Sequence, residues 1–342
     1  MRTGHTIAVL STHRSMTNPV SGIHHMTCYA SDPQANVDFY TDVLGLRLVK
    51  QTVLFSNPVE VFEGEPIYHL YYGNTTGEPG SAITFKPPGT EATRGTITEG
   101  EVGRGQVSAT AYAIPEGSVD YWQSRLADHG VETYGPKERF GDRLLQFRDH
   151  DGLPVELFEG ESDIDSWTGG DVPAEYAIRG FYGATLRPHN ALETGAALET
   201  LGLEEVGQQF TPQRGDWTRY VAPGATRAKY IDLYNTPNFH EGSWGYGTVH
   251  HVAFEVPNEQ ALYTVRERLR NEGFAVTAMK DRKFFKSMYF RDPSGINIEV
   301  ATAEPGFTVD ASPADLGAEL KLPDYLEDQR EELKARLIDV EV

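Results

Sequence analysis

Two histidine pairs and one glutamate are the residues of this sequence whose types and positions best support chemistry. His24-His25 opens one predicted strand, and His250-His251 opens another near the far end of the chain. Glu299 follows in an otherwise apolar strand. Two neutral imidazoles and one carboxylate can hold a non-haem Fe(II) ion on one face and leave the opposite positions open. We therefore expect His25, His251 and Glu299 to meet in the folded chain and to bind a metal ion.

Each of these residues also has an ordinary structural explanation. A single histidine at a strand start is more often a hydrogen-bonded structural residue than a ligand. An ionised glutamate among apolar neighbours is costly to bury unless a cation or a donor satisfies it, so Glu299 favours a metal. Glu156 and Asp232 have similar apolar neighbours, but we expect them to accept hydrogen bonds or to face water. The combination of two His-His pairs with one such glutamate is what favours metal binding.

The elements that must position these residues recur four times along the chain. Each unit reads as a strand, an amphipathic helix and three further strands. The units start near His25, Val107, Gly183 and His251. Units two and three have approximately Ser108 and Gly183 where the other two units have histidine. A complete ligand set therefore requires units one and four, and we expect these two units to share one site. We expect no second metal site in units two and three.

The composition along the chain predicts its division into segments. A stretch rich in Glu, Asp, Ser and Gly separates the second unit from the third, which is typical of a linker. We predict a mobile leader at 1–20, an N-terminal domain with units one and two at 21–160, a linker at 161–177, a C-terminal domain with units three and four at 178–305, and an arm with a helix at 306–342.

The C-terminal arm admits two interpretations. The helix expected from Pro323 to Leu337 has a narrow stripe of leucines that needs a surface to cover it. In the first interpretation the arm packs against a sheet edge and shields it. In the second, Phe307 and the loop after it border the metal site and limit the access of water.

The overall composition excludes some partners. The chain has 342 residues, of which 39% are hydrophobic, one cysteine and a net charge of −20. This acidic protein lacks the basic patches that bind nucleic acid or an anionic membrane. No apolar run approaches the roughly 20 residues that span a bilayer. We expect a cytoplasmic protein without a membrane or nucleic-acid partner, and a homodimer is the default expectation for its assembly.

Several longer motifs resemble one enzyme family. They are Gly22–Thr27, Asp38–Tyr40, Leu44–Lys50, Tyr68–Gly73, Gly247–Phe254 and Glu304–Phe307. With the fourfold repeat, they resemble the vicinal-oxygen-chelate superfamily, which holds glyoxalase I, extradiol dioxygenases and antibiotic-resistance binding proteins. Within it, they are most similar to dioxygenases that cleave the rings of hydroquinones and catechols. The resemblance implies an α+β fold of four βαβββ modules in two domains with cup-shaped mixed β-sheets, the glyoxalase/bleomycin-resistance/dihydroxybiphenyl-dioxygenase fold.

The same resemblance implies a reaction. It implies that His25, His251 and Glu299 bind Fe(II), with Mn(II) as the alternative metal. The substrates would be O2 and a small aromatic diol, either a catechol or a para-hydroquinone, and both oxygen atoms would enter the product in the degradation of an aromatic compound. It also implies site roles for five further residues: His24, Thr27, His250, Arg282 and Tyr289.

These roles can be stated as hypotheses. His24 and Thr27 would contact the substrate, and His250 or Tyr289 would move the phenol proton. Arg282 would hold a developing oxyanion. Arg282 belongs to a short basic stretch, 281–286, which is equally compatible with a solvated surface loop.

Two other functions are compatible with the same fold. Glyoxalase I is a lyase that generally uses four protein ligands, and unit one offers Thr84 or its neighbours rather than a glutamate at the fourth place. A metal-free protein that binds a small molecule is the non-enzymatic alternative. Proteins of that kind usually lose the ligand histidines, whereas this chain keeps both.

Overall fold

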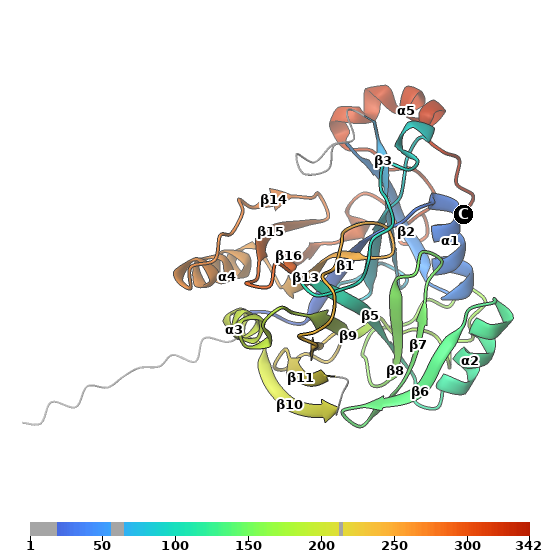
Figure 1. Cartoon of the computed structure of the whole chain (residues 1–342). Helices are drawn as coiled ribbons and strands as arrows, with labels where there is room; N and C mark the ends of the chain where they lie inside the picture. Colours follow the sequence, from blue (N-terminus) through green and yellow to red (C-terminus); the bar gives the residue numbers. More distant parts are fainter. Residues whose placement is uncertain (1–18, 56–64, 212–214) are drawn as a thin grey trace, which may run out of the picture.

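The chain forms two curled mixed β-sheets of eight strands each (Figure 1). A computed structural model describes residues 19–55, 65–211 and 215–342. The strands of the first sheet are, in spatial order, β14 (Lys280–Asp281), β15 (Phe285–Arg291), β16 (Asn297–Pro305), β13 (Val249–Val256), β1 (Ile23–Tyr29), β4 (Ala82–Lys86), β3 (Ile67–Gly73) and β2 (Arg47–Leu54). Those of the second are β10 (Glu204–Thr211), β11 (Gly215–Val221), β12 (Tyr230–Asn235), β9 (Phe181–Arg187), β5 (Gln106–Ile114), β8 (Pro154–Glu159), β7 (Asp142–Arg148) and β6 (Thr133–Arg139).

Each module places one helical segment between its first and second strands, as the repeat predicts. These segments are α1 (Pro33–Asp38) with a π-helical turn at Phe39–Val43, α2 (Val119–Asp128), α3 (Ala191–Leu201) and α4 (Glu259–Asn271). The side chain of Asp32 caps α1 by accepting from the amides of Gln34 and Ala35. The first helical segment stops before Gly45, whose φ of +68° is accessible to glycine at little cost. None of the described helices is long and apolar enough to cross a membrane.

The sheets combine modules from different parts of the chain. The first strands of modules 1 and 4 pair antiparallel, β1 with β13, and those of modules 2 and 3 pair in the same way, β5 with β9. Modules 1 and 4 therefore form one sheet, as the ligand count predicts, and modules 2 and 3 form the other. The predicted linker at 161–177 contains neither helix nor strand. Most of the leader predicted at 1–20 lies outside the described residues.

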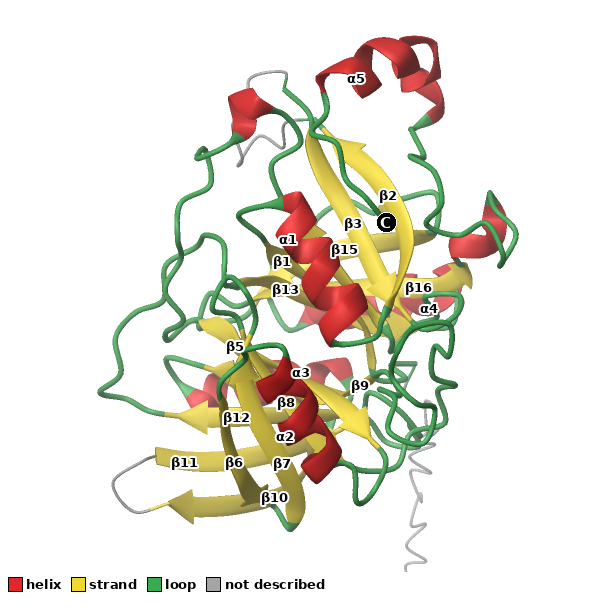
Figure 2. Cartoon of the chain, turned by 90° about the vertical axis from the view of Figure 1, so that its right-hand side faces the viewer, coloured by secondary structure: helices red, strands yellow, loops and turns green. Residues whose placement is uncertain are grey.

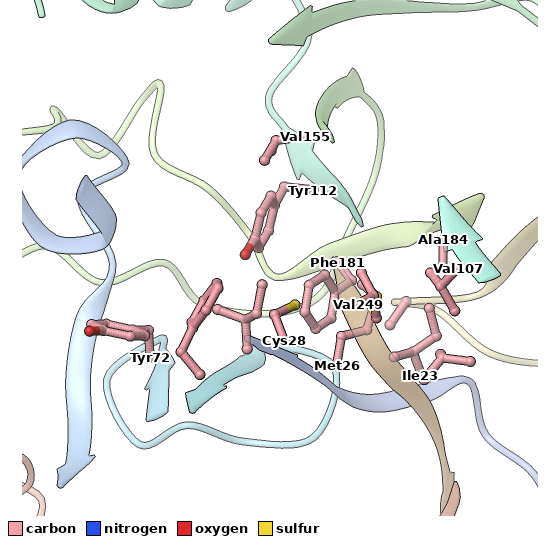
Figure 3. Packing of buried hydrophobic residues seen from close by; sticks show 14 of the residues in the cluster. Ile23, Met26, Cys28, Tyr72, Val107, Tyr112, Val155, Phe181, Ala184 and Val249 are labelled. Atoms are coloured by element: carbon pink, nitrogen blue, oxygen red, sulfur yellow. The ribbon is translucent and has the colours of Figure 1, made fainter. Parts of the chain in front are cut away.

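Strand alternation separates the core from the site on β1. Met26 and Cys28 are fully buried and belong to the large hydrophobic core with Phe181 of β9 (Figure 3). Cys28 thus packs as a small apolar residue. Because successive side chains point to opposite faces, His25 and Thr27 turn to the concave side of the first sheet.

The C-terminal arm covers the β2 edge of the first sheet. The backbone amide of Lys321 donates to the carbonyl of Gln51 at 2.8 Å, and the side chain of Gln51 donates to the carbonyl of Gly317 at 2.8 Å. Arg47 reaches the carbonyls of Ala314 and Leu316. These contacts favour the interpretation of a packing arm, because they satisfy backbone groups on an edge strand.

The helix in this arm is shorter than predicted. A 3₁₀ segment occupies Asp324–Gln329, and only α5 (Arg330–Arg336) is α-helical. The amide of Leu326 donates to the carbonyl of Pro323, a bond three residues back that tightens the first turn. Figure 2 shows α5 beyond the ends of β2 and β3.

Candidate metal centre

The three residues expected to bind a metal lie on adjacent strands, β1, β13 and β16. Cα register pairs His25 with Ala253 across β1 and β13, and Ala253 with Glu299 across β13 and β16. The Nε2 atoms of His25 and His251 are 3.3 Å apart. Oε2 of Glu299 lies 3.3 Å from Nε2 of His25 and 2.7 Å from Nε2 of His251. The structure thus brings together residues that the sequence separates by most of its length.

This spacing suits a single ion. Ligand atoms about 2.1 Å from an ion and at right angles to each other are about 3 Å apart. The observed separations are 2.7 Å for one pair of atoms and 3.3 Å for the other two pairs, so each is within a few tenths of an ångström of that value. His25, His251 and Glu299 are buried, with at most 5% of each exposed. Within the described residues, these three form the one group of histidine, cysteine or carboxylate side chains close enough to hold a metal.

The electrostatics also favour a cation. Burial alone would raise the pKa of Glu299, but the neighbouring imidazoles of His25 and His251 hold it well below its usual range. Burial lowers the pKa of His251 to about 4, so its ring is neutral at pH 7. Neither oxygen of Glu299 accepts a well-aligned hydrogen bond from any described residue. A buried carboxylate without such a bond, beside a neutral imidazole, is an arrangement that a divalent ion would complete.

His24 fixes the tautomer of His25. The Nε2 atom of His24 lies 3.1 Å from the carbonyl oxygen of Thr302, which can only accept, so this nitrogen carries the hydrogen. Burial lowers the pKa of His24 to about 3, so its ring is neutral and Nδ1 is an acceptor. That Nδ1 lies 2.9 Å from Nδ1 of His25. His25 must therefore donate through Nδ1, which leaves the lone pair of its Nε2 free for an ion.

The second histidine pair repeats this contact. Nδ1 of His250 lies 2.6 Å from Nδ1 of His251. The ring of His250 is also T-shaped to Tyr29 at 5.4 Å and tilted against Trp244 at 5.8 Å. His250 therefore contacts the candidate ligand His251 directly, and aromatic side chains hold its orientation.

Tyr289 faces the same side as Glu299, a question that the sequence leaves open. The two residues are register partners across β15 and β16, and the Tyr289 ring lies 5.6 Å from that of His251. Nη2 of Arg282 donates to the Tyr289 hydroxyl at 3.2 Å. The other two cations of this stretch, Lys283 and Lys286, pair with carboxylates instead. Only the arginine of the basic stretch is therefore directed at the site.

The sequence does not reveal Phe285, which packs beside the centre. Its ring centroid is 5.1 Å from that of His24 and 5.2 Å from that of His25. Phe285 and Phe307 line a cavity of about 110 Å³ that reaches His24. Phe307 also contacts Tyr71 at 5.2 Å. Phe307 therefore lies close to the candidate centre, as the second interpretation of the arm expects. The residues after it cover the β2 edge, as the first interpretation expects.

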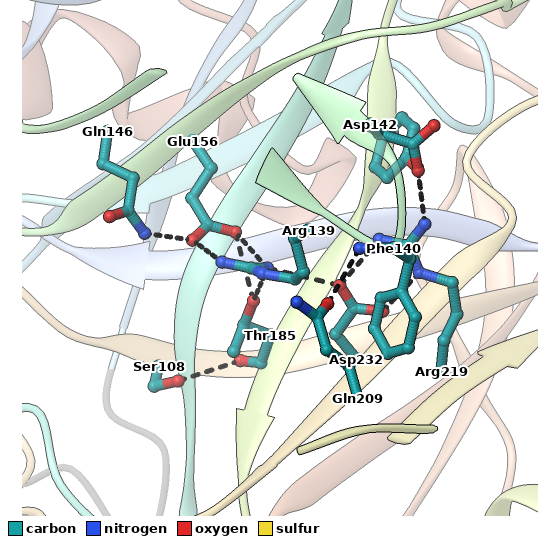
Figure 4. A network of polar contacts seen from close by, with 11 residues as sticks. Ser108, Arg139, Phe140, Asp142, Gln146, Glu156, Thr185, Gln209, Arg219 and Asp232 are labelled. Carbon is teal, nitrogen blue, oxygen red and sulfur yellow. Dashed lines mark hydrogen bonds and ion pairs between the residues drawn. The ribbon is translucent and has the colours of Figure 1, made fainter. Parts of the chain in front are cut away.

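The equivalent positions in the second sheet have no histidine, and an arginine from β6 lies between the two carboxylates there. Register places Ala109 and Gly183 where the first sheet has His25 and His251, so the predicted match at Ser108 is wrong by one residue. Arg139 lies between Glu156 and Asp232, with Nη1 2.9 Å and 3.2 Å from their oxygens (Figure 4). A guanidinium thus supplies the positive charge there, and the expectation that these carboxylates accept hydrogen bonds is confirmed.

Comparisons with known proteins agree with this architecture. The model of the Glyoxalase/Bleomycin resistance protein/Dioxygenase superfamily matches residues 22–157 and 198–300. The chain is 39% identical to the putative ring-cleaving dioxygenase MhqO of Bacillus subtilis (strain 168), over 96% of this chain and 99% of that protein. It is 34% identical to the chlorohydroquinone/hydroquinone 1,2-dioxygenase of Sphingobium indicum, over 94% and 97% of the two chains.

Two solved structures have the same fold. A putative dioxygenase from Bacillus subtilis superposes with a TM-score of 0.85 at 38% identity, covering 95% of this chain and 99% of that one. Glyoxalase I from Zea mays gives a TM-score of 0.57 at 15% identity, over 82% and 92% of the chains, which is a likeness of fold alone. The paired modules, the curled sheets and these matches show that the chain belongs to the Glyoxalase/Bleomycin resistance protein/Dioxygenase superfamily.

Proposed function

We propose that this protein is an Fe(II)-dependent dioxygenase that cleaves the ring of a hydroquinone or a catechol and inserts both atoms of O2. The observation that carries the proposal is the convergence of His25, His251 and Glu299 on the concave face of the first sheet. The relatives add support, because they are named as ring-cleaving dioxygenases, and one of them as acting on hydroquinones.

Three protein ligands leave room for both reactants. Bound Fe(II) would supply the redox chemistry that lets triplet O2 react with a singlet aromatic molecule. His24 would keep the lone pair of His25 available, and the low pKa of Glu299 would keep its carboxylate ionised over the working pH range. Iron is preferred to manganese because of the reaction type, since the ligand types suit either ion.

The remaining site residues would handle protons and charge. His250 would exchange a proton at a ring nitrogen, and Thr27 and His24, both on β1, would contact the substrate. Arg282 would stabilise negative charge that develops on the substrate oxygen, because its guanidinium is already directed at the Tyr289 hydroxyl. Burial raises the pKa of Tyr289 above its ordinary value, so this phenol would act as a hydrogen-bond donor or acid.

Two observations disfavour the other functions. The residue at the place of a fourth ligand is Thr84, whose hydroxyl is already hydrogen-bonded to Thr27 and His69. Glyoxalase chemistry with four protein ligands would lack its last ligand. In a metal-free binding protein the ionised Glu299 carboxylate would be buried with only the imidazoles of His25 and His251 beside it, and a buried charge without a cation is costly.

The proposal is tested by metal analysis and an oxygen electrode. Protein purified without oxygen should contain about one iron per chain and should consume O2 with hydroquinone, chlorohydroquinone or catechol. The same preparation should not convert the adduct of methylglyoxal and glutathione. A preparation that cannot be loaded with metal, or one that is loaded but consumes no O2 with any of the three diols, would contradict the proposal.

A further inference from the structure

A chain of four hydrogen-bonded side chains crosses the concave face of the first sheet beside the candidate metal centre. The Tyr71 hydroxyl lies 2.8 Å from Nδ1 of His69, and Nε2 of His69 lies 2.9 Å from the Thr84 hydroxyl. The Thr84 hydroxyl lies 2.9 Å from that of Thr27. Thr27, Thr84 and Tyr71 are buried.

Register places the Thr27 end of this chain at the metal centre. Thr27 is the Cα partner of His251 across β1 and β13, and it is two residues after His25 on the same face of β1. Directly opposed residues of antiparallel strands have Cβ atoms about 5 Å apart. Residues two apart on one strand are separated by about 6.6 Å. Thr27 therefore flanks two of the three candidate ligands, and the other three members lead away from them across β4 and β3.

The chemistry of the four groups makes the chain directional. A hydroxyl has one hydrogen, and a neutral imidazole has one donor and one acceptor nitrogen. If Tyr71 donates to His69, then His69 donates to Thr84 and Thr84 to Thr27. In the opposite sense, Thr27 donates to Thr84, Thr84 to Nε2 of His69, and Nδ1 of His69 to Tyr71. The three bonds must reverse together. The ring nitrogen of His69 that carries the hydrogen therefore determines whether Thr27 offers a hydrogen or a lone pair to a group on the side of the metal centre.

We propose that this chain is the proton acceptor for the phenolic hydroxyl of the substrate, with His69 as the group that takes up the proton. The substrate O–H bond breaks as its hydrogen passes to the Thr27 oxygen. The hydrogen of Thr27 passes to Thr84, that of Thr84 passes to Nε2 of His69, and a new N–H bond forms there. The substrate becomes a phenolate and His69 becomes an imidazolium. Thr27 then donates to the phenolate oxygen, and reversal of the chain returns the proton later in the reaction.

The surroundings keep His69 in its basic form before substrate binds. Burial lowers the pKa of His69 well below its usual range, and the positive charges of Lys86 and Arg282 and the nearby His25 and His251 lower it further. The ring is therefore neutral at rest and has a lone pair to offer. The negative charge of a phenolate acts in the opposite direction, so proton uptake would be coupled to substrate ionisation.

The proposal rests on the proposed function for its substrate, but a probe can test it without turnover. The decisive variant is Thr84→Val, which has nearly the same shape and breaks the chain at its centre. Thr84→Ser keeps a hydroxyl at that position. Thr110→Val is the matched control, because Thr110 is fully buried on β5 of the other sheet and its hydroxyl has no partner in the described part of the chain.

The probe is 4-nitrophenol bound to the Fe(II)-loaded protein under argon, where the visible absorption of its phenolate reports ionisation. In Thr84→Val we expect the apparent pKa of the bound probe to rise by about one unit or more, which is a tenfold change in proton affinity. Thr84→Ser and Thr110→Val should titrate like the wild type. His69→Gln, which cannot take up the proton, should behave like Thr84→Val.

Turnover provides a second measurement with a different meaning. In Thr84→Val, kcat should fall on the order of 100-fold while KM and iron content change little, because the loss concerns proton transfer. An unchanged probe titration in Thr84→Val would overturn the proposal, even if kcat fell. A wild type that titrates the probe as expected but cleaves no diol would contradict the proposed function and support the chain.

Discussion

Replacing His24 with phenylalanine should weaken metal binding by about 10- to 100-fold, although His24 is not expected to touch the ion. With a metal on Nε2 of His25, its Nδ1 must carry a hydrogen, and His24 accepts that hydrogen at 2.9 Å. In the variant without the metal, no acceptor faces Nδ1, so His25 can carry its hydrogen on Nε2 and donate to Glu299, 3.3 Å away. The variant therefore leaves a buried donor unsatisfied only in the metal-bound state.

The magnitude follows from that difference. A buried donor without a partner costs about 1–3 kcal/mol. At about 1.4 kcal/mol for each tenfold change, this corresponds to a loss of affinity of roughly 5- to 150-fold, a range that includes the expected 10- to 100-fold. His24→Asn is the matched variant, because its amide oxygen lies near the position of Nδ1 and can accept the same hydrogen. It should retain most of the affinity.

The assay is competition for Fe(II) against a chelator under argon, at a pH well above the pKa of about 3 that burial gives His24. A His24→Phe variant that binds iron within twofold of the wild type would refute the reasoning. Equal losses in His24→Phe and His24→Asn would also refute it, because the effect would then come from altered packing rather than from the lost acceptor.

Three further outcomes are expected. The variants His25→Ala, His251→Ala and Glu299→Ala should each stay folded but lose metal retention and O2 uptake. The control Glu156→Gln should keep its metal but melt at a lower temperature, because Arg139 loses its charged partner. In denaturant titrations, the free energy of unfolding of the metal-free protein should fall as the pH falls from about 6.5 toward 4. The pKa of His251 is about 4 in the folded protein and about 6.5 in the unfolded chain, so in this range only the unfolded chain binds the proton and is stabilised by it. Deleting 306–342 should expose the β2 edge and cause aggregation, measured by light scattering. A variant that does not aggregate and turns over normally would contradict this.

The convergence of the candidate ligands could be predicted because the chain repeats. Histidine at the first-strand position of two modules and glutamate at the last strand of one require those modules to share a sheet, and β1 does pair with β13. Alternation then placed Thr27 on the same face as His25. These inferences need only the order of elements and the period of a strand.

The other features of the site depend on register and on side-chain direction, which the sequence does not contain. Whether Tyr289 faces with Glu299 depends on the length of one turn, because a slip of one residue reverses the face. The chain through His69 forms because β3, β4 and β1 align Tyr71, Thr84 and Thr27 in one row. The sequence gives one indication of this chain. His69 and Tyr71 are two residues apart in a predicted strand, so their side chains share one face, whereas the residues that alternate with them are apolar or aromatic.

The pairing of the first module with the last has a consequence for the order of folding. Modules 2 and 3 follow one another in the chain, so the pairing of β5 with β9 closes a comparatively short loop. The pairing of β1 with β13, and of β13 with β16, is possible only after module 4 has been made. During synthesis, the second sheet can form while β1 has β4 beside it but still lacks its other partner, β13. The longest-range contacts carry the largest closure entropy and form slowly. The candidate ligands His25, His251 and Glu299 therefore come together only after β16 has left the ribosome, so a half-made chain holds no assembled candidate metal site.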